Sequence, residues 1–142
     1  MPPFNQDLEM DMPVKVKEFK SKIREADAIL IVTPEYNRSV PGVLKNAIDS
    51  ASRPQGDNPF NDKPIAIMSA SVGMLGGVNA QYDLRKITRY LNMHQVNIPE
   101  VIVTFAQNKF DSNGGLTNEK TGRLLKQLLE NLAIWTKKLR KQ

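Results

Sequence analysis

A strand, a polar loop and a helix follow one another without a gap over residues 28–52. Residues 28–33 are apolar except for Thr33 and mostly β-branched, and the polar loop after them opens at Pro34. From Ser39 to about Ser52 the apolar residues recur at helical spacing. A strand that is apolar on both faces is typical of a parallel sheet covered by helices on each side. This pattern predicts an α/β architecture with the loop at the carboxyl end of a parallel strand.

The same alternation continues along the chain. Two more strands are predicted, over residues 64–69 and within residues 95–105, centred on Val101–Val103. Helices are predicted over residues 13–25, 78–91 and 118–139. The resulting order αβαβαβα favours a parallel sheet with right-handed crossovers and helices on both faces. No linker divides the chain, so residues 1–142 are predicted to form a single three-layer α/β domain.

Composition narrows the possible classes of protein. The chain is 40% hydrophobic and 25% charged, which is ordinary for a globular protein. No apolar run approaches the roughly 20 residues of a membrane span, so no membrane association is expected. Cysteine is absent, which excludes disulfides, thiol catalysis and thiolate metal ligands. Its absence fits a reducing compartment, and we expect a cytoplasmic location.

The net charge of +5 is concentrated at the end of the last predicted helix, in Lys137, Lys138, Arg140 and Lys141. Cations at a helix C-terminus complement the helix dipole, which favours a solvated helix end. A nucleic-acid surface is the alternative, supported by charge alone. No aromatic residues interleave with these cations as base stacking would require, so no nucleic-acid partner is expected.

Two loops at the predicted sheet edge are candidates for ligand binding. Residues 34–39 and 69–77 each follow a strand and precede a helix, so they lie at the same edge, where open parallel sheets bind ligands. Tyr36 offers a flat face and a hydroxyl, and Asn37 offers both a donor and an acceptor. The alternatives are an ordinary turn whose Ser39 caps the next helix, and a flexible glycine-rich loop. Neither loop matches the Walker or dinucleotide fingerprint.

No metal site and no catalytic acid or base is predicted. His94 is the only histidine, and no carboxylate pair lies beside it at ligand spacing. The aspartates Asp49, Asp83 and Asp111 are dispersed along the chain, which argues against a paired-carboxylate mechanism.

Both loops and the helices after them resemble the NADPH-dependent FMN reductase family, whose members are flavodoxin-like. The matching motifs are Pro-Glu-Tyr-Asn at 34–37, Ser-Val-Pro-Gly-x-Leu-Lys-Asn-Ala-Ile-Asp at 39–49, Ser-x-Gly-x-x-Gly-Gly at 71–77 and Gln-Tyr-x-Leu-Arg at 81–85. The resemblance covers nearly the whole chain. It implies a flavodoxin-like sheet in which the three predicted strands are the third, fourth and fifth.

The resemblance also implies an FMN-dependent NAD(P)H oxidoreductase that passes electrons to a quinone, an azo dye, a metal oxyanion or another flavin. The residues implied to contact the flavin ring are Pro34, Glu35, Tyr36 and Asn37 on one side, and Ser71, Gly73, Gly76 and Gly77 on the other. The chemistry belongs to the flavin, so no catalytic side chain is implied. Family members form homodimers or homotetramers, and Gln81, Tyr82 and Arg85 are expected near such an interface.

Family members begin with a strand and a Gly-Ser-x-Arg-x-x-Ser loop that grips the FMN phosphate, and nothing of that kind precedes residue 28. We therefore expect the chain to be the C-terminal part of an N-terminally truncated domain. The strand at 28–33 is then an open sheet edge. The alternative function that follows is a non-catalytic flavodoxin-like module, which folds as an oligomer and binds flavin weakly or not at all.

Overall fold

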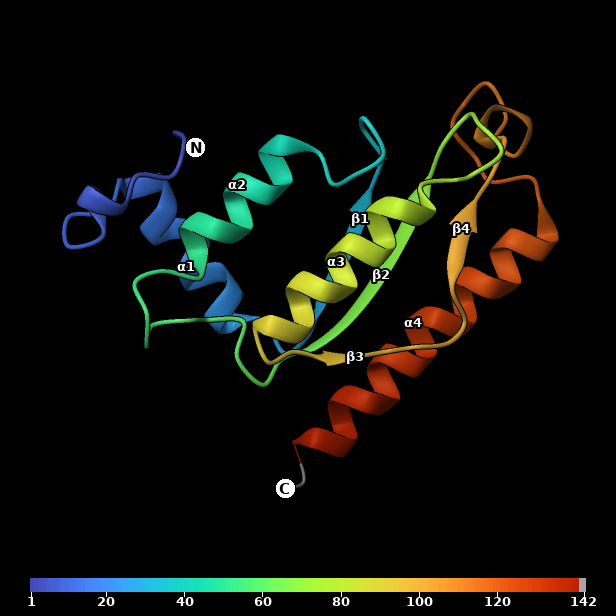
Figure 1. The fold of residues 1–142 in the computed structure, drawn as a ribbon. Coiled ribbons are helices and arrows are strands. Elements are labelled where there is room, and N and C mark those ends of the chain that lie inside the picture. Colours follow the sequence, from blue (N-terminus) through green and yellow to red (C-terminus); the bar gives the residue numbers. More distant parts are fainter. Residues whose placement is uncertain (141–142) are drawn as a thin grey trace.

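The computed structural model describes residues 1–140 and consists of a parallel sheet between two layers of helices (Figure 1). Its elements, in chain order, are the 3-10 turn η1 (Gln6–Leu8), α1 (Val14–Glu25), β1 (Ile29–Thr33), α2 (Gly42–Ala51), β2 (Pro64–Ala70), α3 (Val78–Tyr90), β3 (His94–Gln95), β4 (Val101–Val103), the 3-10 turn η2 (Ala106–Asn108) and α4 (Glu119–Leu139). The predicted αβαβαβα order and the α/β class are confirmed, and Lys141 of the predicted basic cluster lies outside the described residues.

β2 is the central strand of the described sheet. It pairs in parallel with β1 on one side, where Thr33 lies opposite Ser69, and with β3 and β4 on the other, where Ser69 lies opposite Ile102. The predicted third strand is thus divided into β3 and β4. Pro99 lies between these two strands and has no N–H to donate to the ladder, which accounts for the interruption.

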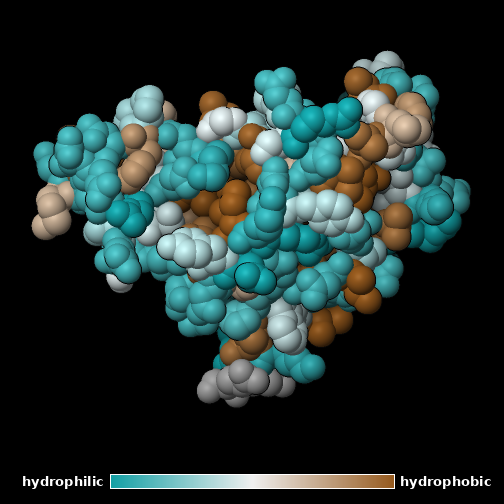
Figure 2. Space-filling view, in the orientation of Figure 1, coloured by the Kyte–Doolittle hydropathy of each residue, from teal (hydrophilic) through white to brown (hydrophobic). Residues whose placement is uncertain are grey.

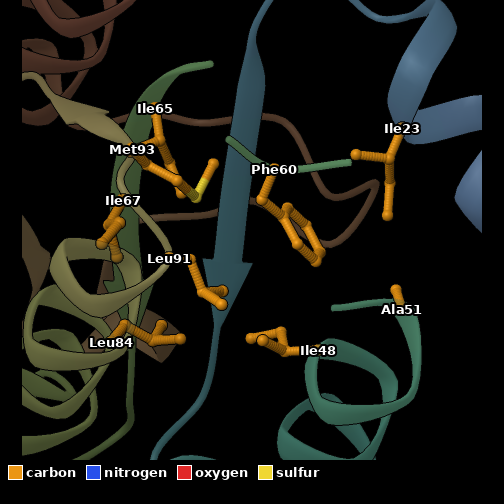
Figure 3. Close-up of a cluster of buried hydrophobic side chains, with 9 residues drawn as sticks. All are labelled: Ile23, Ile48, Ala51, Phe60, Ile65, Ile67, Leu84, Leu91 and Met93. Carbon is orange, nitrogen blue, oxygen red and sulfur yellow. The ribbon is translucent and has the colours of Figure 1, made fainter. Parts of the chain in front are cut away.

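Two hydrophobic cores hold the layers together, one on each face of the sheet. The first lies between the sheet and α1, α2 and α3, and Figure 3 shows its buried side chains: Ile23, Ile48, Ala51, Phe60, Ile65, Ile67, Leu84, Leu91 and Met93. The second lies under α4, where Leu128 and Leu132 pack against Ala66 and Val101. Alternate residues of β2 therefore enter opposite cores, as strand geometry requires.

β1 departs from the prediction that both of its faces are covered. Ile29 and Ile31 pack against the first core, but Leu30 is 40% exposed and Val32 is 57% exposed. The reason is that α4 packs on β2 and β4 and leaves the neighbouring face of β1 open. Within residues 1–140, β1 pairs with β2 alone, which agrees with the predicted open edge.

Lys20 is buried on α1, although a lysine beside the apolar stripe of a surface helix is normally solvated. The residue is 2% exposed, and its Nζ donates to the carboxylate of Asp57 (2.7 Å), to the Asp57 carbonyl (3.0 Å) and to the Arg53 carbonyl. These partners lie in the long loop after α2, so Lys20, together with Arg24 of the same helix, fixes that loop against α1.

The end of the long C-terminal helix carries the described residues of the predicted basic cluster. Lys137, Lys138 and Arg140 are exposed, Arg140 forms an ion pair with Asp27, and the Lys138 ammonium lies 5.8 Å from the centre of the Trp135 ring. Searched over the described part of the chain, neither α4 nor any other helix combines the length and apolarity needed to cross a membrane.

Candidate functional site

The two predicted loops lie at one edge of the sheet, at the carboxyl ends of β1 and β2 (Figure 1). The parallel register places the last residue of β1, Thr33, beside Ser69, so both loops leave the sheet at the same level. A third segment, which follows β4, joins them there. The Ser71 N–H donates to the Val103 carbonyl (3.0 Å), and the Ala106 N–H donates back to the Ser71 carbonyl (3.0 Å).

The first loop ends in a tight reverse turn. Tyr36 and Ser39 exchange backbone hydrogen bonds of 3.1 and 3.0 Å, and the two central residues, Asn37 and Arg38, have φ of 49° and 66°. Positive φ at both central residues defines a type I′ turn. The turn leaves the Tyr36 side chain exposed at the edge of the sheet. Pro34 and Asn37 are exposed as well.

Ser39 does not cap the following helix, as one interpretation of the sequence had it. The helix α2 begins after Pro41 without a side-chain cap, and the Ser39 hydroxyl donates to the carboxylate of Asp83 at 2.7 Å. Asp83 lies on α3. Its pKa is lowered by hydrogen bonds from Lys86 and Ser39, which favour the ionised form. Ser39 therefore ties the first loop to the helix that follows the second loop.

Glu35 makes a second link between the same two parts. Its carboxylate accepts hydrogen bonds from the N–H groups of Asn79 (2.9 Å) and Ala80 (3.2 Å) and from the Asn79 side-chain amide (3.1 Å). These are free N–H groups at the start of α3, whose own N-cap, Gly77, has no side chain to offer. Glu35 thus caps a helix 44 residues away and holds the two loops together.

This capping shifts the pKa of Glu35. Partial burial acts to raise the pKa, but the hydrogen bonds from the start of α3 outweigh it, with a smaller contribution from the charge of Arg38. The pKa of Glu35 therefore lies below its ordinary value of 4.5. Because the pKa is lower in the folded state, ionised Glu35 stabilises the fold above about pH 4.5, and this stabilisation is lost as pH falls through the lowered value.

We expect Glu35→Gln to lower the free energy of unfolding by about 1 kcal/mol at neutral pH, as loss of a capping carboxylate typically does. The difference from the wild type should shrink as pH falls through the folded pKa of Glu35, because the wild-type carboxyl is then also neutral. Urea unfolding followed by circular dichroism between pH 7 and pH 3 measures it. Glu119→Gln is the matched control, since Glu119 lies in the first turn of α4 and is exposed. A deficit of Glu35→Gln that stayed constant with pH would contradict this account.

The glycine-rich loop is closely packed where it meets the sheet. Gly76 and Gly77 are buried and have φ of 60° and 89°. A Cβ at Gly76 would lie 2.5 Å from the Ile102 side chain, and one at Gly77 would lie 2.7 Å from the Cβ of Ser69. Both glycines are thus required by the packing of the loop on β2 and β4.

The outer part of the same loop is open. Gly73 is exposed, and a Cβ there would meet only the Ser71 hydroxyl, at 3.7 Å. That hydroxyl accepts a hydrogen bond from the Gly73 N–H (3.1 Å). The hydrophobic side chains of Val72 and Met74 are exposed on either side, and Figure 2 shows hydrophobic atoms among polar ones over this part of the molecule. An open backbone with apolar neighbours suits a flat ring that has a polar edge.

Sequence reasoning missed the buried polar chain beneath this loop. The Gln81 amide is 1% exposed and donates to the Ser69 hydroxyl (2.9 Å) and to the Val101 carbonyl (2.8 Å). Ser69 in turn donates to the Gly76 carbonyl (2.7 Å).

The three residues expected near a subunit interface differ in exposure. Gln81 is buried inside the chain. Tyr82 and Arg85 differ: Tyr82 is exposed, and Arg85 is partly buried 3.7 Å from Glu100.

Within residues 1–140, no group of three or more histidine and acidic side chains is arranged to hold a metal ion. His94 lies in β3, at the opposite end of the sheet from the loops, 3.4 Å from Asp62. Polar loops and exposed hydrophobic side chains meet at the loop edge, an arrangement that suits the binding of a flat cofactor.

Comparisons with known proteins identify the class to which this site belongs. Residues 1–108 match the family model described as NADPH-dependent FMN reductase, and the chain belongs to this family. It is 47% identical over 141 residues to an NAD(P)H-dependent FMN reductase of Pseudomonas aeruginosa, covering 99% of this chain and 76% of that protein. It is 46% identical over 143 residues to an NADPH:quinone oxidoreductase of Arabidopsis thaliana, covering 98% and 71%.

A solved structure agrees with this assignment. The fold is similar to that of FerB, a flavoenzyme NAD(P)H:(acceptor) oxidoreductase of Paracoccus denitrificans, with a TM-score of 0.89 and 36% sequence identity. The match covers 97% of this chain and 76% of that one. The predicted flavodoxin-like fold is therefore confirmed, and so, at the level of the family, is the predicted FMN- and NAD(P)H-dependent oxidoreductase.

Proposed function

We propose that this protein transfers electrons from NAD(P)H through bound FMN to a quinone. The observation that carries the proposal is the pairing of the two family loops at one sheet edge, where the Glu35 carboxylate joins the first loop to the helix after the second. In the overall reaction NAD(P)H and a proton are consumed, and NAD(P)⁺ and a hydroquinone are formed. A quinone is the acceptor named for the relative from Arabidopsis thaliana.

The eight candidate residues fall into two groups in this proposal. Five residues, all exposed or partly exposed, are proposed to face the cofactor directly: Pro34, Tyr36, Asn37, Ser71 and Gly73. The other three hold the loops from beneath: Glu35, Gly76 and Gly77. Bound FMN supplies the redox chemistry as a two-electron relay. The chain fixes the position of the ring and offers apolar side chains to an aromatic acceptor.

The assembly and location of the protein are also part of the proposal. We infer a homodimer or a homotetramer, in which exposed hydrophobic residues such as Leu30, Val32 and Tyr82 become covered. Uncovered apolar surface of this kind favours association. The absence of cysteine supports a reducing compartment such as the cytoplasm.

The proposal is tested by titrating the purified chain with FMN and following flavin fluorescence, then measuring NADPH oxidation with a benzoquinone as acceptor. We expect saturable binding with a Kd near one micromolar, about −8 kcal/mol, and oxidation that depends on added FMN. Gly73→Val places a branched side chain at the open part of the glycine loop and should weaken FMN binding about tenfold. Unchanged FMN affinity in this variant would remove the glycine loop from the site.

Gly122→Val is the matched control. Gly122 lies on α4, where an added Cβ would make an ordinary contact with Leu116 at 3.8 Å. The control should bind FMN as the wild type does. If the wild type showed no saturable binding, the alternative of a non-catalytic flavodoxin-like module would be favoured instead.

A further inference from the structure

Arg38 occupies a backbone conformation that an arginine rarely adopts. It is the second central residue of the type I′ turn, with φ of 66°, a position at which glycine is strongly preferred. The left-handed conformation brings the Cβ of any other residue too close to a neighbouring carbonyl oxygen. Strained residues of this kind cluster at ligand sites. An arginine at this position therefore suggests a role for its side chain.

The Arg38 side chain is exposed and carries a free charge. Within residues 1–140, none of the ion pairs closer than 4 Å includes Arg38. The charge of Arg38 acts on the Glu35 carboxylate, but that carboxylate already accepts hydrogen bonds from the N–H groups at the start of α3. Two basic side chains on the helices beside this loop are paired with carboxylates, Lys45 with Asp49 and Lys86 with Asp83. Arg38 is thus available to an anionic ligand.

We propose that Arg38 binds the 2′-phosphate of NADPH and sets the preference for NADPH over NADH. This inference rests on the proposed function, because it places the nicotinamide donor beside the loop of residues 34–39. Guanidinium groups bind phosphate through paired, charge-assisted hydrogen bonds. An arginine near the ribose accommodates the 2′-phosphate of NADP in other dinucleotide sites. The exposed turn presents Arg38 at the margin of the site, and the proposal places the adenosine end of the dinucleotide beside it.

Binding of adenosine 2′,5′-bisphosphate and of 5′-AMP, measured by calorimetry, isolates the contribution of the 2′-phosphate. We expect the wild type to bind the bisphosphate about tenfold more tightly than 5′-AMP, the effect of one charge-assisted contact. Arg38→Gly should abolish this preference yet raise the Tm by about 2–5 °C, because it relieves the strained turn. Arg38→Lys should keep part of the preference. Arg89→Ala, an exposed cation near the end of α3, is the matched control and should leave the preference intact.

Persistence of the preference in Arg38→Gly would overturn the inference, as would its absence from the wild type. The affinities of the variants for FMN and for riboflavin, which lacks the 5′-phosphate, test whether Arg38 binds the flavin phosphate instead. If Arg38→Gly weakened FMN but not riboflavin, while the bisphosphate preference persisted, Arg38 would belong to the flavin phosphate and the proposal would be wrong. Wild-type FMN binding and NADH oxidation are measured separately, so a failure of the proposed function is recognised independently of the nucleotide result.

Discussion

Gly76→Ala should destabilise the protein by about 2–5 kcal/mol, the sum of a left-handed alanine and an overpacked site. The φ of Gly76 is 60°, and an added Cβ would lie 2.5 Å from the Ile102 Cγ2, 3.0 Å from the Thr104 Cγ2 and 3.2 Å from the Thr104 backbone nitrogen. The last contact is with backbone and cannot be relieved by a rotamer change. Urea unfolding followed by circular dichroism measures the loss. Because the loop must move away from β4 to accept the methyl group, FMN binding should weaken as well.

Gly73→Ala is the control for Gly76→Ala, because it places an alanine in the same loop at a position where the added Cβ causes no clash. An added Cβ at Gly73 would meet only the Ser71 hydroxyl at 3.7 Å, so its stability should stay within about 0.5 kcal/mol of the wild type. Equal stability of the two variants would show that Gly76 is not held against Ile102 and Thr104.

The glycine-rich loop illustrates what the sequence can and cannot predict. Three glycines after a predicted strand correctly placed a loop at the sheet edge, and the resemblance to the family implied that this loop binds FMN. The pattern alone could not distinguish a glycine that faces a ligand from one that packs on a strand. That distinction depends on Ile102 and Thr104, which belong to β4 and its exit and lie about 26 residues further along the chain.

Contacts between distant segments account for the other differences. The strands and helices were predicted because each has its own apolar period. Hydrogen bonds such as Glu35 to Asn79 and Ser39 to Asp83 join residues 44 positions apart and leave no local signal. A serine before a helix is usually interpreted as a cap, and Ser39 was interpreted in this way as one alternative. In the structure the Ser39 hydroxyl bonds to Asp83 of α3 instead of capping α2.

The burial of Lys20 is a second case in which a tertiary contact could not be predicted from the local sequence, this time within a helix. Val16, Phe19 and Ile23 define the apolar stripe of α1, and a lysine next to such a stripe is normally solvated. Here the loop after α2 covers the side chain and supplies three oxygen acceptors to its ammonium group. A long loop rich in Pro, Gly, Asn and Asp gave no indication of where it would fold back.

Lys20→Met should therefore lower the free energy of unfolding by about 2–4 kcal/mol, because it leaves the carbonyl groups of Arg53 and Asp57 without a donor. Methionine retains most of the buried hydrocarbon, so the loss reports on the ammonium group itself. Lys17→Met is the control on the same helix. The Lys17 ammonium lies 3.6 Å from the Asp11 carboxylate in an exposed ion pair, which is worth about 0–1 kcal/mol. Thermal and urea unfolding of the two variants measure the difference.

The acid sensitivity of the protein provides an independent check on the Lys20 contact. The hydrogen bond from Lys20 is the main cause that lowers the pKa of Asp57 below its ordinary value of 3.8, ahead of the opposing effect of burial. Ionised Asp57 therefore stabilises the fold above about pH 3.8, and this stabilisation is lost as pH falls through the lowered pKa. In Lys20→Met the ionised Asp57 stabilises the fold less, because only Arg24 remains paired with its carboxylate. Protonation of Asp57 at low pH therefore costs this variant less stability than it costs the wild type. The stability deficit of Lys20→Met should accordingly narrow as the pH is lowered, and a deficit that widened would mean that Asp57 does not depend on Lys20.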